Sequence, residues 1–400
     1  MKFNVEELVP SEKALALLFD RWMPVPETET VPLNEAVGRV LAENQFAKYT
    51  LPVVRAAMMD SIALRSMDFD RGIPDTSGWT RGVEYEFADM GDDFDDRFDA
   101  VIPVEEAKFL SDGTIRIRED ASVHPGAGIR KAGTIAQKGE LLLPMGCRLV
   151  PTDLCVLATG GIREVPVFRR PVVAIIPTGS ELIPLGEVPQ RGQNIDSNSL
   201  MLKHMALSMG AEPLCYPIVK DIPNQMSVTL EDALAKADIV VVNAGSSKGE
   251  EDFSTRLLRR MGTFLFHGVR AVPGRPMSVS LVGSKPVVNL PGPPIAAFNA
   301  ADWCLRAVVS RFLQTSGQRR PRIKAILTAP LDGPPALRCT SRMRVYRADG
   351  TVYADPVPKE KGSTVEIMAA NGVYISPVGE GRLEAGREID VELLRSESSF

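Results

Sequence analysis

The chain has 400 residues, of which 44% are hydrophobic and 24% are charged, and its formal net charge is -5. This length and apolar content predict a soluble globular protein with several folding units rather than a disordered one. The slight acidic excess argues against nucleic acid as a partner, because such proteins normally present a basic surface. Five cysteines without a C-x-x-C pair and three scattered histidines predict neither a disulfide framework nor a zinc or histidine-based metal centre.

Two further absences in the sequence bear on where the protein works. No apolar run has the length that a membrane helix needs, and the first residues lack the basic and then apolar segments of a signal peptide. We therefore expect a cytoplasmic protein with no membrane partner.

The first 170 residues show two different sequence patterns. Residues 1–45 and 132–170 combine helical periodicity with short extended segments, and together they predict a linker domain of helices and strands. Residues 46–131 contain short alternating segments separated by acidic and Gly-rich stretches such as ADMGDDFDDRFDA. This pattern predicts a small β-rich insert.

From residue 171 onward, apolar strands alternate with helical patterns. PVVAIIP, DIVVVNAG and KPVVNL have the continuous apolar character of strands that are covered on both faces. Such alternation predicts a doubly wound, mostly parallel sheet over residues 171–316, and hence a multidomain α/β fold. After the polar segment TSGQRRPR, residues 317–400 show short alternating strands with Gly and Pro turns, which predict a small β-barrel or sandwich.

Three loops that follow these strands combine small residues with carboxylates. They run from Thr178 to Glu181, from Ala244 to Asp252 and from Pro291 to Pro294. Ligands of an open parallel sheet lie beyond the carboxyl ends of its strands, and Gly-rich loops at helix starts present backbone N–H groups to anions. The carboxylates Glu181, Asp221 and Asp252 suit Mg²⁺ shared with a substrate phosphate. The loops therefore predict a metal-bridged phosphate site.

Each of these residues also has a purely structural explanation. Loops of the TGxE or GSSxG type often serve only as turns and helix caps, and Lys248 is either a phosphate partner or merely solvated. Asp221 is either a metal ligand or the cap of the next helix. Among Asp196, Ser197 and Asn198, one side chain can cap the following helix while the others bond a ligand.

Several motifs, taken in chain order, carry a more specific signal. The α/β region contains PTGSEL, NIDSNS, NAGSSKGEEDF, VPGRP and NLPGPPIAAF, and the segments before it include RAAMMDSIAL and RKAGTIAQKGELLLPMGCRLVP. With these motifs, nearly the whole chain resembles the molybdopterin molybdenumtransferase family, the MoeA and gephyrin E-domain proteins of molybdenum cofactor synthesis.

This resemblance implies an elongated homodimer of four-domain subunits, with the linker domain in dimerisation and a β-barrel at the C-terminus. It implies that adenylylated molybdopterin and molybdate are the substrates, that Mg²⁺ assists molybdate insertion, and that AMP is released. Handover of the product to a molybdoenzyme or its chaperone would follow. The alternative is a paralogue that binds or delivers the cofactor without metal insertion. An adenylyltransferase is less favoured, because the flanking domains match the insertase.

The resemblance also assigns roles by position. The implied catalytic carboxylates are Asp60, Glu181, Asp221 and Asp252, of which the last three are the metal ligands. The implied contacts to the pterin nucleotide and oxyanion are Thr178, Gly179, Asp196, Ser197, Asn198, Gly245, Ser246, Ser247, Lys248, Gly249, Arg275, Pro291, Gly292 and Pro294. Without the resemblance, Asp60 would not be predicted as a catalytic residue, because a lone Asp after two methionines is usually a capping residue.

Several positions depart from the family pattern. Where the family has other residues, this chain has Ser61, Ile62, Ile135, Ser180, Val272 and Pro293, and the acidic MGDDFDDRF replaces a Thr-Gly-Ala-Pro segment. The loss of one charge-assisted hydrogen bond costs about 1.5–3 kcal/mol, so several such losses weaken anion binding severely. The substitutions predict either altered catalysis or a site without turnover.

Overall fold

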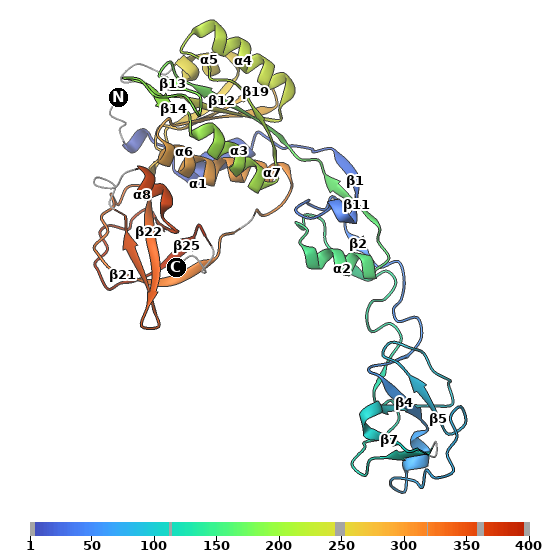
Figure 1. Ribbon diagram of the computed structural model, residues 1–400. Helices are drawn as coiled ribbons and strands as arrows, with labels where there is room; N and C mark the ends of the chain where they lie inside the picture. Colours follow the sequence, from blue (N-terminus) through green and yellow to red (C-terminus); the bar gives the residue numbers. More distant parts are fainter. Residues whose placement is uncertain (1–4, 112–113, 245–252, 318, 358–363, 396–400) are drawn as a thin grey trace. The chain divides into compact units, whose positions relative to one another are not determined.

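The computed structural model describes residues 5–111, 114–244, 253–317, 319–357 and 364–395. The chain forms two compact units, one made of Met1–Glu29 with Phe168–Phe400 and the other of Thr30–Val167 (Figure 1). The finer division into four domains, with boundaries at residues 45, 131, 170 and 316, stays a prediction. None of the helices in the described part of the chain has the length and apolar content needed to cross a membrane.

A six-stranded sheet forms the centre of the first unit, in the order β15-β12-β16-β20-β19-β17. The first four of these strands run parallel to one another, and β19 pairs antiparallel with both of its neighbours, β20 and β17. This arrangement confirms the predicted doubly wound, mostly parallel sheet. The strands are β12 (Val172–Thr178), β15 (Glu212–Cys215), β16 (Ile239–Ala244), β17 (Thr263–His267), β19 (Ser278–Val282) and β20 (Lys285–Leu290).

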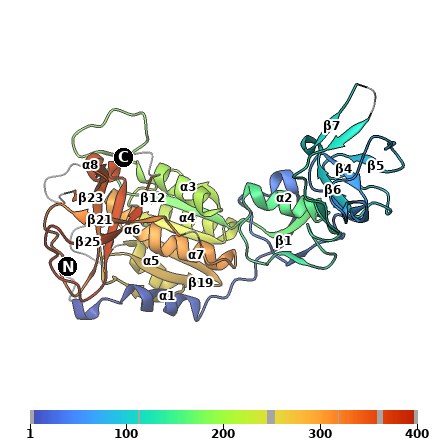
Figure 2. The same cartoon turned by 90° about the horizontal axis from the view of Figure 1, so that it is seen from below.

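Helices cover both faces of this sheet. Helices α4 (Pro223–Lys236) and α5 (Phe253–Met261) lie on one side, and α3 (Asn198–Met209), α6 (Pro294–Ala300) and α7 (Arg306–Phe312) lie on the other (Figure 1, Figure 2). A π-helical segment, η5 (Ala301–Leu305), joins α6 to α7. Elements β13 (Leu182–Ile183), β14 (Asn194–Ile195), β18 (Ala271–Val272), η1 (Val5–Glu7) and α1 (Ser11–Phe19) complete this part. Because both faces are covered, the central strands are almost wholly apolar, which explains their continuous runs in the sequence.

The strand order creates a crevice at one edge of the sheet. From β12 the chain passes to β15 on one side and then returns to β16 on the other side of β12. At the carboxyl ends of this central pair, Thr178 stands opposite Ala244. In doubly wound folds, ligands bind where the strand order reverses in this way.

The C-terminal strands close into a barrel. Strand β22 (Arg338–Ala348) pairs with both β23 (Thr351–Pro356) and β24 (Gly372–Ser376), and β21 (Arg322–Leu327) and β25 (Glu388–Leu393) complete the ring. A short helix, α8 (Thr364–Ala369), precedes β24. The alternating pattern of the sequence places one face of each strand in the barrel core, and the predicted β-barrel is confirmed.

The second unit contains short elements around several small cores. Strands β1 (Thr28–Pro32) and β11 (Glu164–Phe168) carry the chain into and out of it. Its other elements are η2 (Leu33–Glu35), β2 (Gln45–Phe46), β3 (Ala56–Ala57), β4 (Ser61–Leu64), η3 (Ser66–Phe69), β5 (Tyr85–Ala88), β6 (Ala100–Pro103), η4 (Val104–Glu106), β7 (Ala107–Phe109), β8 (Ile115–Ile117), β9 (Ile129–Arg130), β10 (Leu141–Leu143) and α2 (Pro151–Thr159). One buried cluster lies around α2, and two lie around the three-stranded sheet β5-β4-β6.

A half-buried carboxylate in this unit predicts a pH-dependent contribution to stability. The Ser66 backbone N–H and hydroxyl donate to the two oxygens of Asp99, each at 2.7 Å. Burial opposes ionisation of Asp99, but the two Ser66 hydrogen bonds, together with a backbone hydrogen bond of Asp99 and the charge of Arg55, hold the pKa below its usual value. The stabilisation is therefore present above the unfolded pKa and is lost as the pH falls through the lowered native pKa.

We expect Asp99→Asn to lower the urea midpoint of this unit at neutral pH, with the difference from the parent protein shrinking as the pH falls from about 5 through the lowered native pKa. Fluorescence of Trp79, which lies in the same unit, measures the transition. The exposed carboxylate of Asp96 provides a control, Asp96→Asn. A difference between Asp99→Asn and parent that does not vary with pH would contradict this role for Asp99.

Candidate active site

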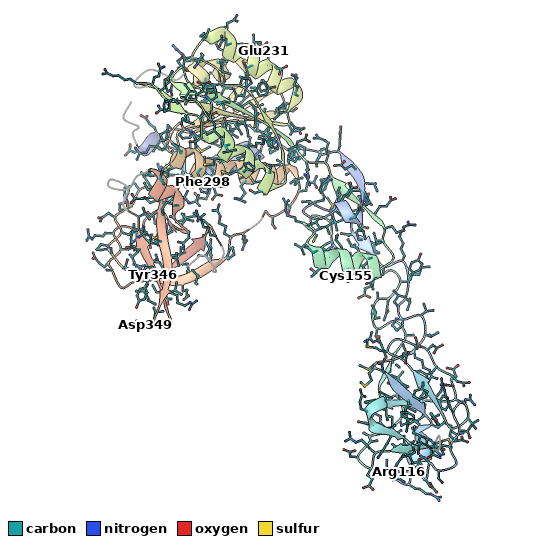
Figure 3. The ribbon with its side chains drawn as sticks, viewed as in Figure 1. Arg116, Cys155, Glu231, Phe298, Tyr346 and Asp349 are labelled. Carbon is teal, nitrogen blue, oxygen red and sulfur yellow. The ribbon has the colours of Figure 1, made fainter. Side chains whose placement is uncertain are left out.

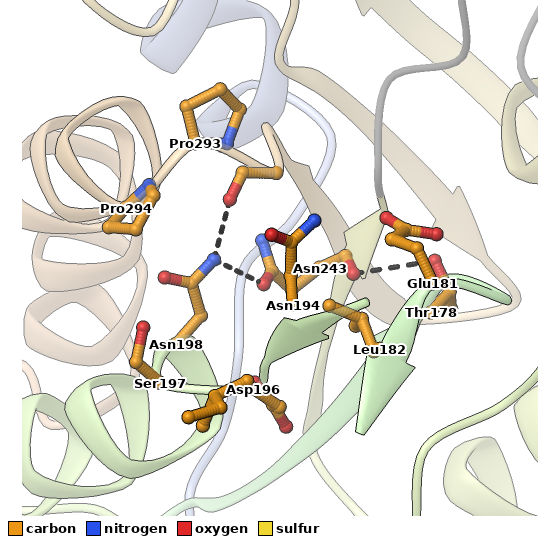
Figure 4. A pocket seen from close by; sticks show the side chains of 12 residues that line it. Thr178, Glu181, Leu182, Asn194, Asp196, Ser197, Asn198, Asn243, Pro293 and Pro294 are labelled. Atoms are coloured by element: carbon orange, nitrogen blue, oxygen red, sulfur yellow. Dashed lines mark hydrogen bonds between the residues drawn. The ribbon is translucent and has the colours of Figure 1, made fainter. Parts of the chain in front are cut away.

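A pocket of about 510 Å³ opens at the carboxyl ends of β12, β16 and β20 (Figure 4). Its lining comes from the segments after β12, before α3, at the end of β16 and before α6. The residues are Thr178, Glu181, Leu182, Asn194, Ile195, Asp196, Ser197, Asn198, Asn243, Gly292, Pro293 and Pro294. The pocket thus joins the first and third of the loops predicted to bind phosphate.

Two buried asparagines hold these segments together. Asn198 Nδ2 donates to Asn243 Oδ1 at 2.8 Å and to the Gly292 carbonyl oxygen at 2.7 Å. Asn243 Nδ2 donates to the Pro291 carbonyl oxygen at 2.8 Å, and Thr178 Oγ1 donates to the Asn243 carbonyl oxygen at 3.3 Å. Because buried amides are costly to leave unpaired, this network holds α3, β16 and the loop before α6 at one spacing. Asn243 was not among the predicted residues, although a polar residue ending the run VVVN was a visible signal.

The segment before α3 divides its polar side chains between folding and the pocket. Asp196 Oδ1 accepts the Ser199 backbone N–H at 3.0 Å, so Asp196 supplies the capping interaction of this helix. Ser197 occupies the N-cap position but makes no capping bond with its side chain, and it lines the pocket. The buried Asn198 side chain mainly makes the hydrogen bonds to Asn243 and Gly292 described above.

The Glu181 carboxylate folds back over Gly179. A Cβ atom on Gly179 would lie 2.7 Å from Glu181 Oε2, and the backbone there has φ of +148°, so a side chain at this position would displace the carboxylate. Among the described residues, none forms a hydrogen bond or ion pair with the Glu181 carboxylate. Glu181 therefore presents a free negative charge at the edge of the pocket.

Asp221 is bonded to the neighbour of Glu181. Asp221 Oδ2 accepts the Ser180 backbone N–H at 3.0 Å, and Ser180 Oγ accepts the Asp221 backbone N–H at 3.1 Å. The N-cap residue of α4 is Ile222, with no capping bond from a side chain. The alternative that Asp221 caps the next helix is therefore wrong, because its carboxylate turns toward the loop after β12.

The donor set of this region suits a hard cation. Glu181 and Asp221 offer carboxylate oxygens from adjoining loops, and Mg²⁺ is commonly held by one or two carboxylates together with water and phosphate. Within the described ranges there is no group of three His, Cys, Asp or Glu side chains arranged to hold a metal ion. The third predicted ligand, Asp252, lies outside those ranges, as do Gly245, Ser246, Ser247, Lys248 and Gly249.

Asp60 belongs to the second unit. Its side chain is exposed, and Oδ1 accepts the Met90 backbone N–H at 3.0 Å, which ties the acidic loop after β5 to the MMDSIA turn. Ser61 begins β4 without a positive φ, and Ile62 is fully buried in the core of the small sheet. The substitutions that follow Asp60 are therefore accommodated by strand packing.

The remaining substituted positions have separate surroundings. Ile135 has an exposed fraction of 50%, and Val272 lies in β18, paired with Cys339 of the barrel strand β22. Pro293 is the N-cap residue of α6 and lines the pocket. The predicted anion contact Arg275 has a buried Nε atom without a hydrogen-bond partner.

A second arginine, Arg342 in β22, was missed from the sequence. Its side chain stacks over the ring of Phe298 of α6, 4.3 Å from the centroid, and its exposed fraction is 4% (Figure 3 labels Phe298). The Nε and Nη2 atoms have no acceptor. Burial, reinforced by the nearby charge of Arg320, lowers the pKa of Arg342 to about 10. The charge of Asp302 favours the cation, but the two buried N–H donors lack an acceptor, and such donors suit contact with an oxyanion.

Comparisons with known proteins extend over most of the chain. Residues 9–161 match the family model of the MoeA N-terminal region (domain I and II), and residues 174–311 match the model of a probable molybdopterin binding domain. The chain is 29% identical over 391 residues to a molybdopterin molybdenumtransferase of Bacillus subtilis, covering 93% of this chain and 91% of that protein. A putative molybdopterin biosynthesis protein of Methanocaldococcus jannaschii is 27% identical, covering 98% of this chain and 99% of that protein.

A solved structure gives the same result. The molybdopterin biosynthesis MoeA protein of Pyrococcus horikoshii superposes with a TM-score of 0.79 at 28% identity, covering 96% of this chain and all of that chain. The motifs, the closed C-terminal barrel, the doubly wound domain and these relatives agree. The chain therefore belongs to the molybdopterin molybdenumtransferase (MoeA) family.

Proposed function

We propose that this chain is a magnesium-dependent enzyme that inserts molybdate into adenylylated molybdopterin and releases AMP. The observation that carries the proposal is the pocket at the reversal point of the sheet, where the free Glu181 carboxylate stands beside hydroxyl groups and a helix start. This is the position at which a doubly wound sheet binds a nucleotide. The family and the names of the relatives supply the reaction.

The residues of the pocket would have two roles, binding of the nucleotide and binding of Mg²⁺. Thr178, Ser197 and the loop from Pro291 to Pro294 would hold the nucleotide, with the asparagine network keeping its walls in place. Glu181 and Asp221 would hold Mg²⁺, joined by the predicted ligand Asp252. When bound, Mg²⁺ neutralises the phosphate charge and so favours departure of AMP. The Ser180 N–H bond holds the carboxylate of Asp221 beside the loop after β12.

Two arginines provide contacts for the oxyanion. Arg342 has two buried N–H donors that lack an acceptor, and Arg275 has one. A tetrahedral oxyanion such as molybdate would supply these acceptors and a compensating charge. Arg342 is linked to the pocket through α6, because Phe298 follows Pro294, a pocket residue, by about one helical turn.

Release of AMP from adenylylated molybdopterin tests the proposal. With Mg²⁺ and molybdate, the parent protein is expected to release AMP, and omission of either ion should abolish release. Glu181→Gln keeps the shape of the side chain and removes its charge, so it should bind the nucleotide but release little AMP. If the parent protein binds the substrate tightly but releases no AMP, the insertase proposal is rejected, and the alternative of a carrier that delivers the cofactor is supported.

The same proposal includes the assembly and location implied by the resemblance. We expect a homodimer in the cytoplasm that passes the finished cofactor to a molybdoenzyme or its chaperone. Sedimentation equilibrium of the full chain measures the oligomeric state.

A further inference from the structure

We propose that Ser180 is a positioning residue that sets the spacing between the carboxylates of Glu181 and Asp221. This inference rests on the proposed function, because it concerns the magnesium ligands of that site. Its basis is a pair of reciprocal hydrogen bonds between the loop after β12 and the loop after β15. Ser180 N–H donates to Asp221 Oδ2 at 3.0 Å, and Asp221 N–H donates to Ser180 Oγ at 3.1 Å.

The two loops are already in register before this pair is reached. The Val219 N–H donates to the Pro177 carbonyl oxygen at 2.9 Å, and the Gly179 N–H donates to the Val219 carbonyl oxygen at 3.1 Å. These bonds continue the parallel pairing of the sheet beyond its last strand residues. The Ser180–Asp221 pair is therefore the last in a series of hydrogen bonds between the two segments, and beyond it the two loops separate.

Glu181 is held from both sides while its own carboxylate stays free. Besides the bonds of Ser180, Lys220 Nζ donates to the Leu182 carbonyl oxygen at 3.1 Å and to the Ser180 carbonyl oxygen at 3.4 Å. The residues before and after Glu181 are thus both fastened to the Lys220–Asp221 segment. Because the Asp221 Oδ2 atom accepts the Ser180 N–H, its Oδ1 atom remains for a cation, and the carboxylate of Glu181, the residue after Ser180, also stays free.

The chemistry of serine explains why this arrangement favours a cation. Two carboxylates repel each other, so free loops would separate in the absence of a metal, and binding would have to bring them back. The Ser180 hydroxyl accepts the Asp221 N–H without adding a third negative charge. Ser180 therefore contributes geometry, and the affinity comes from the carboxylates that it spaces.

Mn²⁺, used as a probe for Mg²⁺, tests the inference. Its binding to the full chain in the presence of AMP is measured from the electron paramagnetic resonance signal of free Mn²⁺. Ser180→Ala removes one hydrogen bond and should weaken Mn²⁺ about two- to tenfold. Ser180→Thr keeps the hydroxyl and should retain the parent affinity. Ser180→Asp keeps an acceptor and adds charge, so it should bind Mn²⁺ at least as tightly. All three variants should keep the parent's urea midpoint without metal, since Ser180 is exposed.

Ser227→Ala is the matched control, because Ser227 is an exposed hydroxyl on α4 that bonds Glu231 instead. Equal Mn²⁺ affinity of Ser180→Ala and the parent would overturn the positioning role and leave the proposed function standing. No Mn²⁺ binding by the parent would overturn both the positioning role and the metal site. If the variants show the expected order of Mn²⁺ affinities but the parent releases no AMP, the proposed insertase activity is rejected and the positioning role of Ser180 stands.

Discussion

Replacement of Asn243 by leucine should lower the free energy of unfolding of the first unit by about 2–4 kcal/mol. The exposed fraction of Asn243 is only 3%, and its side chain both accepts from Asn198 and donates to Pro291. Leucine has a similar size but can do neither. The Pro291 carbonyl oxygen and one N–H of Asn198 would remain buried without a partner.

The same replacement should weaken AMP binding by at least about tenfold, because the loop before α6 would lose the bond that ties it to the end of β16. Urea unfolding and calorimetric titration with AMP measure the two effects. Asn194 also lines the pocket, but its side chain is exposed and makes no bond within the described part of the chain, so Asn194→Ala is the matched control. Parent-like stability of Asn243→Leu would show that the network carries little energy.

Replacement of Arg342 by methionine should have opposite effects on stability and binding. Burial lowers the pKa of this guanidinium, so its charged form costs the folded state free energy at neutral pH. Methionine would fill part of the space over the Phe298 ring, where the guanidinium stacks, and remove the buried charge. We expect a gain of about 1–3 kcal/mol in unfolding free energy, by analogy with buried charges replaced by apolar groups.

Molybdate binding to Arg342→Met should fall by at least about tenfold, because two charge-assisted donors are removed. Calorimetric titration of the full chain with molybdate measures this loss. Arg344, two residues along the same strand, is exposed and provides the control Arg344→Met. A destabilised Arg342→Met variant that still binds molybdate like the parent would assign Arg342 a structural role only.

Much of the fold was predictable, because local patterns reflect burial directly. The apolar runs ending at Thr178, Ala244 and Leu290 correspond to β12, β16 and β20, which are covered on both faces. The alternating tail closes into the barrel as expected. The position of the pocket also followed from the sequence, since loops after parallel strands meet at one edge of the sheet.

The unpredicted features depend on partners that lie far away in the chain. The bond between Ser180 and Asp221 joins residues 41 positions apart, so the sequence left Asp221 open as either a metal ligand or a helix cap. Arg342 sits in an alternating strand, where a basic residue normally faces solvent. In the folded chain, however, it stacks over Phe298 of α6 and is buried. Asn243 looked like the polar end of a strand because its amide partners lie 45 and 48 residues away.

The asparagine network has a further consequence for how the pocket forms during folding. Its bonds join segments separated by as many as 94 residues, so the chain must close large loops before any of these bonds is made. Contacts of such high order appear late and cooperatively. A partly folded chain would therefore have no nucleotide site, and bound nucleotide would stabilise only the completely assembled domain.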